Sequence, residues 1–510
     1  MTNYIQRGQA AINSKNMPEA VQWFEKAVKE KPADAQALAC LGQALCWQGQ
    51  RKKGLNLLHK ACKRIAKKAI KSRDTKPLLL MIEQLQFWDD FQGSLEFAKQ
   101  AVQINKNDLR GFQILSLTYS RLNKNKLALN AGLQALKKAP SNPILNILQA
   151  ILEAREGQTD AATQRLETVI NLPNANNEEK FRAHKELANI LDKKREYNKV
   201  FPHLYKSAEL AQQLPAIQKQ NKSFIGQMLK TNKIKFHKDL FTQCSQSSSN
   251  TNQPSPVFLI GFLRSGTTLT QEVLDTHSNV FISDEADFIF ALRNELNKIS
   301  NNQSSVPEQL KNLDAADLEH LRQFYWSNVK QRYGDEFSEQ LFIDKTTMNT
   351  LDLGLINCVF PEAKILFVMR DPRDICISCF MQIMTPSPTT VHLFDWQDTI
   401  NLYCQTMDWW MHFKDITTLD YIEFRYEDAV SQFETTFRTV FNFIGLELNA
   451  TATEFHKYAA KKYIVSPSFS QVSQPLYTSS VARWRNYDSE FINSNQQLLP
   501  YIREFNYESS

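Results

Sequence analysis

The stretch covering residues 257–269 holds the side chains best suited to do chemistry. It reads V-F-L-I-G-F-L-R-S-G-T-T-L, an apolar run followed by a loop with a glycine at each end and then two threonines. A strand, turn and helix of this kind point consecutive backbone N–H groups and the positive end of the helix at a bound anion. The sequence therefore predicts a phosphate-binding loop. Its predicted contacts are Arg264, Ser265, Gly266, Thr267, Thr268 and Leu269.

One position separates this loop from that of the nucleotide triphosphatases. The pattern is G-x4-G-T-T, with Thr267 where those enzymes carry the lysine that contacts the β- and γ-phosphates. No aspartate-rich strand that could hold a metal follows it. A P-loop kinase or NTPase is therefore the less favoured alternative. Arg264 supplies a cation inside the loop, where it could reach across a bridging oxygen.

Four short apolar runs in the second half of the chain predict the elements that position such a site. They cover residues 257–260, 341–343, 364–369 and 421–424, and each precedes charged or hydroxyl residues and a helical pattern. This alternation is typical of a parallel sheet covered by helices on both faces. Ligands of such sheets bind outside the carboxyl ends of the strands. The residues at those ends are Arg264 to Thr268, Asp344 and Lys345, Arg370 to Asp374, and Tyr426 to Asp428.

The first two hundred residues repeat with a period of about 34. Gly8 and Ala20 in the first unit return as Gly42 and Gly54 in the second. Small residues at fixed offsets let paired helices approach closely, and the pattern resembles the tetratricopeptide repeat. About six units fill residues 1–212 and predict an all-α solenoid. The concave face of such a solenoid commonly receives a protein or peptide, although a rigid spacer or a dimer surface would carry the same pattern.

Length and composition agree with more than one soluble domain. A chain of 510 residues exceeds the size at which single cores stop growing. We expect a solenoid over 1–212, a helical segment with a polar linker over 213–253, and an α/β domain over 254–510. The beginning of the chain has no apolar segment, and no run approaches the length of a membrane span, so we expect a cytoplasmic protein.

The eight cysteines show no regular spacing, which favours free buried thiols over a disulfide framework. Cys376 and Cys379 form a C-x-x-C pattern without a second pair or a nearby histidine. We therefore expect no metal site.

The segment covering residues 51–76 concentrates the positive charge. It holds eleven Lys or Arg against Asp74 alone, whereas the whole chain has a net charge of only +6. A solvated helical face explains such a segment, and so does a docking surface for an acidic partner.

Taken together, the motifs of residues 254–490 resemble the sulfotransferase family. The loop resembles the motif that holds the 5′-phosphosulfate of 3′-phosphoadenosine 5′-phosphosulfate (PAPS). The run F-V-M-R-D-P-R-D-I-C-I-S resembles the motif whose arginine and serine grip the 3′-phosphate, here Arg370 and Ser378. The resemblance implies an α/β fold with a central parallel sheet and metal-free transfer of a sulfuryl group from PAPS to an acceptor hydroxyl.

Within the family the chain is most similar to bacterial sulfotransferases with tetratricopeptide repeats and to tyrosylprotein sulfotransferases. Their catalytic base corresponds to Glu285 and their catalytic lysine to Lys345. At the position of Lys345 small-molecule sulfotransferases have the run Lys-Thr-His, in which the histidine is the base. This chain reads Lys-Thr-Thr there. Glu285 is therefore the preferred base, with Asp284 and His277 as alternatives.

The resemblance also implies nucleotide contacts nearer the C-terminus. Arg483 matches a lysine that contacts the nucleotide, Ser468 falls near another contact, and Tyr426 follows the last predicted strand. One departure is the run D-K-T-T-M-N at 344–349, which lacks the proline that bacterial relatives usually carry.

The acceptor is left open by the sequence. The repeats and the basic segment favour tyrosine of an acidic protein or peptide, while glycans, lipids and small phenols stay possible. A repeat-based scaffold with an inactive transferase domain is the alternative from another functional class. We expect Arg264 and Lys345 to stabilise the leaving phosphate and Glu285 to accept the acceptor's proton.

Overall fold

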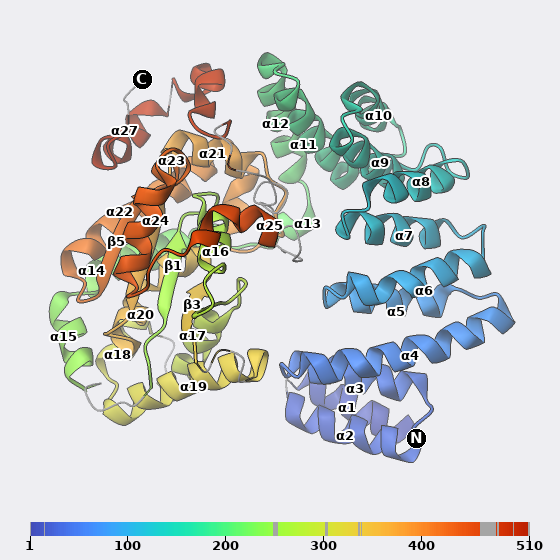
Figure 1. Ribbon diagram of the computed structural model, residues 1–510, viewed down its shortest axis with the longest axis horizontal. Coiled ribbons are helices and arrows are strands. Elements are labelled where there is room, and N and C mark those ends of the chain that lie inside the picture. The colour runs from blue at the N-terminus through green and yellow to red at the C-terminus, as the bar shows by residue number, and fades with distance from the viewer. Residues whose placement is uncertain are drawn as a thin grey trace. The chain divides into compact units, whose positions relative to one another are not determined.

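A computed structural model of the chain divides it into two compact units (Figure 1). The structure describes residues 2–14, 16–247, 253–300, 304–334, 337, 339–459, 476, 479–492 and 494–507. The first unit is Met1–Glu196 with Gln331–Tyr333, and the second is Tyr197–Lys330 with Gly334–Ser510.

Helices alone make up the N-terminal part of the chain. Within the described residues up to 211 they form six successive pairs, which confirms the repeat predicted from the period. The helices are α1 (Thr2–Asn13), α2 (Met17–Glu30), α3 (Ala35–Trp47), α4 (Arg51–Ser72), α5 (Lys76–Phe87), α6 (Phe91–Ile104), α7 (Leu109–Arg121), α8 (Asn125–Leu136), α9 (Pro143–Arg155), α10 (Thr159–Asn171), α11 (Asn177–Lys193) and α12 (Tyr197–Ala211).

The repeated small residues lie where the helices of a pair cross. A Cβ atom at Gly54 would be 2.5 Å from the carbonyl oxygen of Gly42, so α3 and α4 touch through their backbones. Asp34, Asp90 and Asn142 accept hydrogen bonds from first-turn N–H groups and so begin α3, α6 and α9. Close crossings and capped ends explain why the period is readable in the sequence.

Helix α12 belongs to the second unit, although the repeat pattern predicted one domain over 1–212. The ring centroid of Phe201 lies 5.2 Å from that of Trp396, 5.3 Å from that of Tyr487 and 6.1 Å from that of Phe380. The units therefore divide after Glu196, because the apolar face of α12 packs on residues far along the chain.

A five-stranded parallel sheet forms the centre of the second unit. Its strands are β1 (Val257–Gly261), β2 (Val280–Ile282), β3 (Leu341–Lys345), β4 (Lys364–Met369) and β5 (Asp420–Arg425), in the order β2-β3-β1-β4-β5. The four predicted strands and the parallel sheet are confirmed. The short edge strand β2 was not predicted, since three residues show no pattern of their own.

Helices cover both faces of this sheet. Among the described residues beyond α12, the α-helices are α13 (Pro215–Gln218), α14 (Ser223–Lys235), α15 (Lys238–Ser247), α16 (Thr267–Leu274), α17 (Phe288–Ile299), α18 (Val306–Lys311), α19 (Ala315–Tyr333), α20 (Leu353–Val359), α21 (Pro372–Phe380), α22 (Trp396–Ile416), α23 (Tyr426–Ser431), α24 (Phe433–Phe443), α25 (Phe455–Ala459) and α27 (Asn495–Glu504). The 3₁₀ helices are η1 (Thr347–Asp352), η2 (Thr390–Phe394), η3 (Ala450–Glu454) and η4 (Arg483–Phe491).

Side chains at alternate positions of the strands pack against the helices on the two faces of the sheet. Leu259 packs in one cluster with Val273 of α16 and Phe437 of α24. On the other face Phe367 stacks on Trp410 of α22 with ring centroids 3.8 Å apart. Both faces are thus buried, as expected for a parallel sheet. In the described ranges no helix combines the length and the apolar character needed to cross a membrane.

Candidate active site

The loop after β1 adopts a conformation that favours glycine at its last position. Gly266 has φ +112° and caps the N-terminus of α16, and Arg264 has φ +68°. A Cβ atom at Gly266 would lie 2.7 Å from the ring of Tyr426. Any side chain here would therefore meet both backbone strain and a clash, so the loop conformation depends on this glycine.

Donors of the loop are buried and in part unpaired. The hydroxyl of Ser265 is buried and has no hydrogen-bond partner among the described residues. Thr267 shares a hydrogen bond of 2.9 Å with Thr347, and Thr268 is buried at the start of α16. The side chain of Leu269 packs in the core. An unsatisfied buried hydroxyl at a helix N-terminus fits a bound phosphate or sulfate group.

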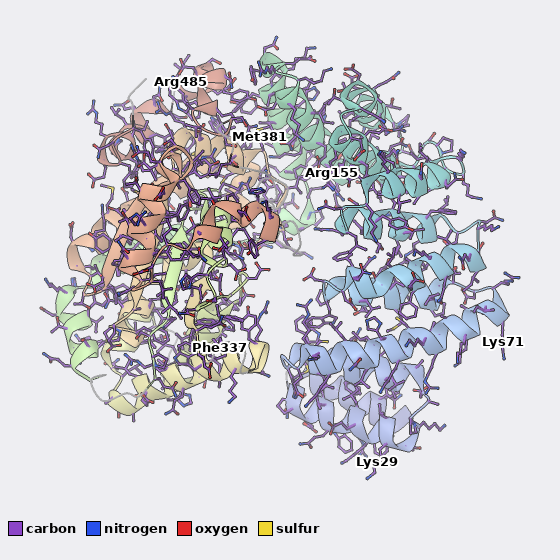
Figure 2. The ribbon with its side chains drawn as sticks, viewed as in Figure 1. Lys29, Lys71, Arg155, Phe337, Met381 and Arg485 are labelled. Carbon is purple, nitrogen blue, oxygen red and sulfur yellow. The ribbon has the colours of Figure 1, made fainter. Side chains whose placement is uncertain are left out.

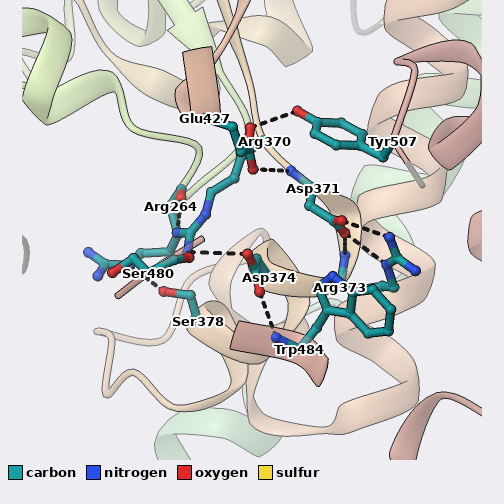
Figure 3. Close-up of polar contacts among 10 residues, drawn as sticks. All are labelled: Arg264, Arg370, Asp371, Arg373, Asp374, Ser378, Glu427, Ser480, Trp484 and Tyr507. Carbon is teal, nitrogen blue, oxygen red and sulfur yellow. Dashed lines mark hydrogen bonds and ion pairs between the residues drawn. The ribbon is translucent and has the colours of Figure 1, made fainter. Parts of the chain in front are cut away.

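A second cluster of donors lies at the end of β4 and joins the loop directly (Figure 3). Arg264 donates from Nε to the hydroxyl of Ser378 at 3.1 Å. Arg370 donates from one Nη to the carbonyl oxygen of Arg264 at 3.1 Å, while its buried Nε has no hydrogen-bond partner in the described part of the chain. The two predicted anion motifs therefore form adjacent parts of one site.

The C-terminal segment contacts this cluster. Arg370 donates to the carbonyl oxygen of Ser480 at 2.6 Å, and the N–H of Trp484 donates to Asp374 at 2.8 Å. Burial raises the pKa of Asp374 to about 6. Arg483 begins η4, with its guanidinium 2.7 Å from the sulfur of Met381. The predicted contact Ser468 lies outside the described residues.

The predicted base and catalytic lysine form an ion pair. The Nζ atom of Lys345 lies 2.5 Å from an Oε atom of Glu285, although 60 residues separate them in sequence. The side chain of Lys345 is fully buried, whereas that of Glu285 is 47% exposed. Glu285 also has φ +43°, and its N–H donates to the carbonyl oxygen of Lys345 at 3.1 Å. The structure thus brings these residues together at the carboxyl ends of β2 and β3.

Comparison with known proteins agrees with this geometry. Residues 256–450 match the sequence model of the sulfotransferase family. This part of the chain is a sulfotransferase domain.

A relative from Aquifex aeolicus (strain VF5), itself uncharacterized, is 26% identical over 359 residues, which is 68% of this chain and 45% of the relative. The chain thus spans less than half of that relative's length. The crystal structure of MamA shares 15% identity over 33% of this chain and 89% of MamA, with a TM-score of 0.28. YrrB, a TPR protein with an unusual peptide-binding site, shares 16% identity over 33% of this chain and 84% of YrrB, with a TM-score of 0.27.

Behind the ion pair, the sulfotransferase domain holds a buried carboxyl. Asp344 accepts a hydrogen bond of 2.8 Å from the hydroxyl of Tyr325, and the hydroxyls of Ser283 and Thr346 lie 3.5 Å away. Complete burial raises the pKa of Asp344 to about 7. The hydroxyl of Ser283 also accepts from the N–H of Lys345 at 2.9 Å. This network therefore holds the main chain beside the ion pair of Glu285 and Lys345.

The alternative bases lie at different ends of the sheet. Asp284 follows β2 beside Glu285, whereas His277 precedes β2 and accepts a hydrogen bond from the N–H of Asn279 at 3.1 Å. In a parallel sheet the residues before a strand lie at the amino-terminal ends of the strands. The site lies at the opposite, carboxyl ends. His277 is therefore remote from Lys345, and Asp284 is the remaining alternative to Glu285.

Two residues of the sulfotransferase domain make contacts that no sequence motif predicted. Tyr325 comes from the middle of α19, and no motif marks it. Glu427 accepts from the N–H of Asp371 at 3.0 Å and from the hydroxyl of Tyr507 at 3.0 Å (Figure 3). Burial raises the pKa of Glu427. The sequence offered one signal, since Glu427 lies in the run Tyr426 to Asp428 that follows a predicted strand.

Proposed function

We propose that the chain transfers a sulfuryl group from PAPS to the hydroxyl of an acceptor. The observation that carries this proposal is the ion pair of Glu285 and Lys345 beside the loop after β1. A carboxylate that can accept a proton and a cation that can stabilise a leaving group stand next to each other there. Two adjacent groups of anion donors complete the requirements for a donor that carries phosphate at both ends.

The residues present fit the donor. Ser265, Thr267 and Thr268, with the N–H groups of the loop, would hold the 5′-phosphosulfate, and the unpaired Ser265 hydroxyl is available for it. Arg370 and Ser378 would hold the 3′-phosphate, with the unpaired Nε of Arg370 as one donor. PAPS, when bound, supplies a sulfuryl group on a good leaving group. Arg483 and Tyr426 are proposed as further nucleotide contacts.

Different side chains accept the proton of the acceptor and stabilise the leaving group. Glu285 accepts the proton of the acceptor hydroxyl, since its side chain is 47% exposed and so accessible from solvent. Lys345 and Arg264 stabilise negative charge on the departing bisphosphate. Because the transition state of such a transfer is loose, positioning and charge stabilisation supply most of the rate enhancement.

Tyrosine of an acidic protein or peptide is the acceptor that we propose. A hydroxyl acceptor follows from the base, and an acidic polypeptide would complement the basic segment at 51–76. Glycans, lipids and small phenols are tested by the same assay.

Calorimetry and mass spectrometry test the proposal together. The protein is expected to bind adenosine 3′,5′-bisphosphate and to bind ATP at least tenfold more weakly, on the order expected for a lost specific phosphate contact. Proteins of a native lysate incubated with the enzyme and PAPS should gain the mass of one sulfuryl group on tyrosine. Tight ATP binding without bisphosphate binding would favour the kinase alternative, and donor binding without any transfer would favour the inactive scaffold.

A further inference from the structure

Helix α21 and the 3₁₀ helix η4 meet through a stacked pair of buried side chains, Arg373 and Trp484 (Figure 3). The guanidinium carbon of Arg373 lies 3.5 Å from the ring centroid of Trp484. The edge of the same guanidinium donates to both carboxylate oxygens of Asp371, at 3.0 and 2.8 Å. Arg373 and Trp484 are 1% and 4% exposed, so the stack is shielded from water. We name these two residues the anchor pair.

The anchor pair holds a late segment of the chain against α21. Arg373 lies in the first turn of α21, and Trp484 lies in η4. The N–H of Trp484 also donates to the carboxylate of Asp374 at 2.8 Å. Figure 2 labels Met381, directly after α21, and Arg485 of η4, which mark the two elements. The main chain around Trp484 is therefore fixed to this helix at two points.

The segment held in this way orients Arg370. One Nη of Arg370 donates to the carbonyl oxygen of Ser480 at 2.6 Å, and the other donates to that of Arg264 at 3.1 Å. Ser480 precedes Trp484 by only four residues. The buried Nε of Arg370 has no hydrogen-bond partner in the described part of the chain. A planar guanidinium held at two nitrogens presents the third in one direction, so the aim of this donor depends on where Ser480 is held.

Asp371 connects the anchor pair with the beginning of α21. Its carboxylate accepts from the N–H of Arg373 at 2.9 Å and so caps the N-terminus of the helix. Its own N–H donates to Glu427 at 3.0 Å. Ser378 lies further along the same helix. One carboxylate therefore holds Arg373 and also fixes the start of the helix that carries Ser378.

We propose that Arg373 and Trp484 are positioning residues that let the site distinguish a nucleotide with a 3′-phosphate from one without it. The inference rests on the proposed function, in which Arg370 and Ser378 hold the 3′-phosphate. The anchor pair acts through Ser480, whose carbonyl oxygen keeps the guanidinium of Arg370 in the binding orientation. A nucleotide without a 3′-phosphate gains nothing from that orientation, so only the affinity for the bisphosphate depends on the anchor pair.

A purely structural role of the anchor pair makes a different prediction. Trp484 also packs near Phe491, with ring centroids 6.5 Å apart, and buried aromatic contacts stabilise a fold whatever they position. A structural contact would not need the guanidinium, however, because apolar side chains fill such a space without burying a charge. Stability and nucleotide preference must therefore be measured separately.

Calorimetry of the full-length protein with adenosine 3′,5′-bisphosphate and with 5′-AMP measures the preference. Trp484→Leu removes the ring face, and Arg373→Lys keeps the charge but loses the planar contacts. The matched controls Trp326→Leu and Arg322→Lys change buried side chains of the same unit. The guanidinium carbon of Arg322 likewise lies over a ring, 5.9 Å from the centroid of Phe360. Thermal melting followed by circular dichroism checks each fold, and Arg373→Lys carries the test if Trp484→Leu does not fold.

The affinity for the bisphosphate should fall about tenfold in Trp484→Leu and about threefold in Arg373→Lys, on the order of one misplaced charged hydrogen bond. The affinity for 5′-AMP should stay within about twofold of wild type, so the preference for the bisphosphate falls. The controls should keep the wild-type preference even where they lower the melting temperature. In a transfer assay both test variants should raise KM for PAPS and leave kcat within about twofold, because Glu285 and Lys345 are unchanged.

An unchanged preference in both test variants, with a wild type that prefers the bisphosphate, would overturn the inference and leave the proposed function standing. An equal loss of affinity for the two nucleotides, or the same loss of preference in the controls, would also overturn it, since either result shows a structural role. A loss of preference confined to the test variants, found together with no transfer by the wild type to any acceptor, would support the anchor pair and count against the proposed function.

Discussion

Glu285 and Lys345 differ sharply in exposure, and that difference separates their roles. The ammonium group of Lys345 is fully buried, so it depends on the carboxylate of Glu285 for its charge compensation. The carboxylate is half exposed and can meet an acceptor from solvent. In the absence of ligand the ion pair holds both groups in place. A bound donor would offer Lys345 a second anionic partner.

Substitution of Glu285 by glutamine should remove catalysis while sparing donor binding. The amide keeps the shape of the side chain but accepts no proton, so the rate of sulfuryl transfer should fall about 10²–10⁴-fold. Calorimetric affinity for adenosine 3′,5′-bisphosphate should change by less than about threefold, because no predicted nucleotide contact is lost. Asp284→Asn is the matched control, with a small effect on rate. Equal losses of rate and of bisphosphate affinity would contradict the role of base.

Asp344 should make stability depend on pH. The folded chain keeps a proton on this carboxyl up to about pH 7, whereas the unfolded chain loses it near pH 4, about the ordinary value. The folded state therefore binds more protons between these values, and its stability from this group falls as pH rises through them. Above pH 7 that stability stays lost.

The variant Asp344→Asn removes this dependence. Its free energy of unfolding relative to wild type, measured by urea denaturation, should rise from pH 5 to pH 8. The exposed Asp415→Asn should show no such trend. A difference between Asp344→Asn and wild type that stays constant with pH would show that the buried carboxyl does not titrate in this range.

At the scale of elements, the loop between β1 and α16 decides whether donors converge. Its conformation needs positive φ at two positions, and Tyr426 of α23 packs directly over Gly266. The site thus combines a local turn with a residue more than 150 positions further along the chain. Both contributions fix the conformation of the loop.

Gly266→Ala should disrupt the loop and weaken binding of adenosine 3′,5′-bisphosphate by at least tenfold, since a Cβ atom there meets the ring of Tyr426 at 2.7 Å. Gly157→Ala is the control, because Gly157 has φ +80° but open space around its Cβ position. The control should lose about 1 kcal/mol of stability from backbone strain alone and keep full bisphosphate affinity. Calorimetry and thermal melting distinguish the two effects, and unchanged affinity in Gly266→Ala would exclude the loop as the phosphate site.

For the whole molecule, the boundary between repeats and transferase lies within the last helix pair. Phe201 of α12 packs among aromatic residues of the second unit. Tyr205 of the same helix donates a hydrogen bond of 2.6 Å to Glu490. Helix α12 thus packs as part of the second unit, even though its sequence continues the repeat pattern.

A chain that begins at Tyr197 should therefore remain folded and bind adenosine 3′,5′-bisphosphate. A chain that begins at Gln213 should melt several degrees lower, because loss of a buried aromatic contact such as Phe201 costs about 3–5 kcal/mol. Calorimetry of both truncated proteins checks this. Equal melting temperatures of the two truncated proteins would place the domain boundary at residue 212, as the repeat pattern predicts.

The sequence alone determined what depends on short stretches of chain. The repeat period, four of the strands and the phosphate loop each rest on residues within a few turns of one another, where periodicity and turn chemistry act locally. The same holds for the charge of the segment at 51–76. Edge strand β2 is too short to leave such a signal.

Only the tertiary structure decided which distant residues meet. Strand order places Glu285 next to Lys345, and His277 lies at the opposite, amino-terminal ends of the strands. Helix packing brings Tyr325 to Asp344. The tertiary structure also assigned α12 to the second unit. It left one face of α4 without a partner in the described structure. These outcomes depend on burial and on contacts between segments tens to hundreds of residues apart, which no local pattern encodes.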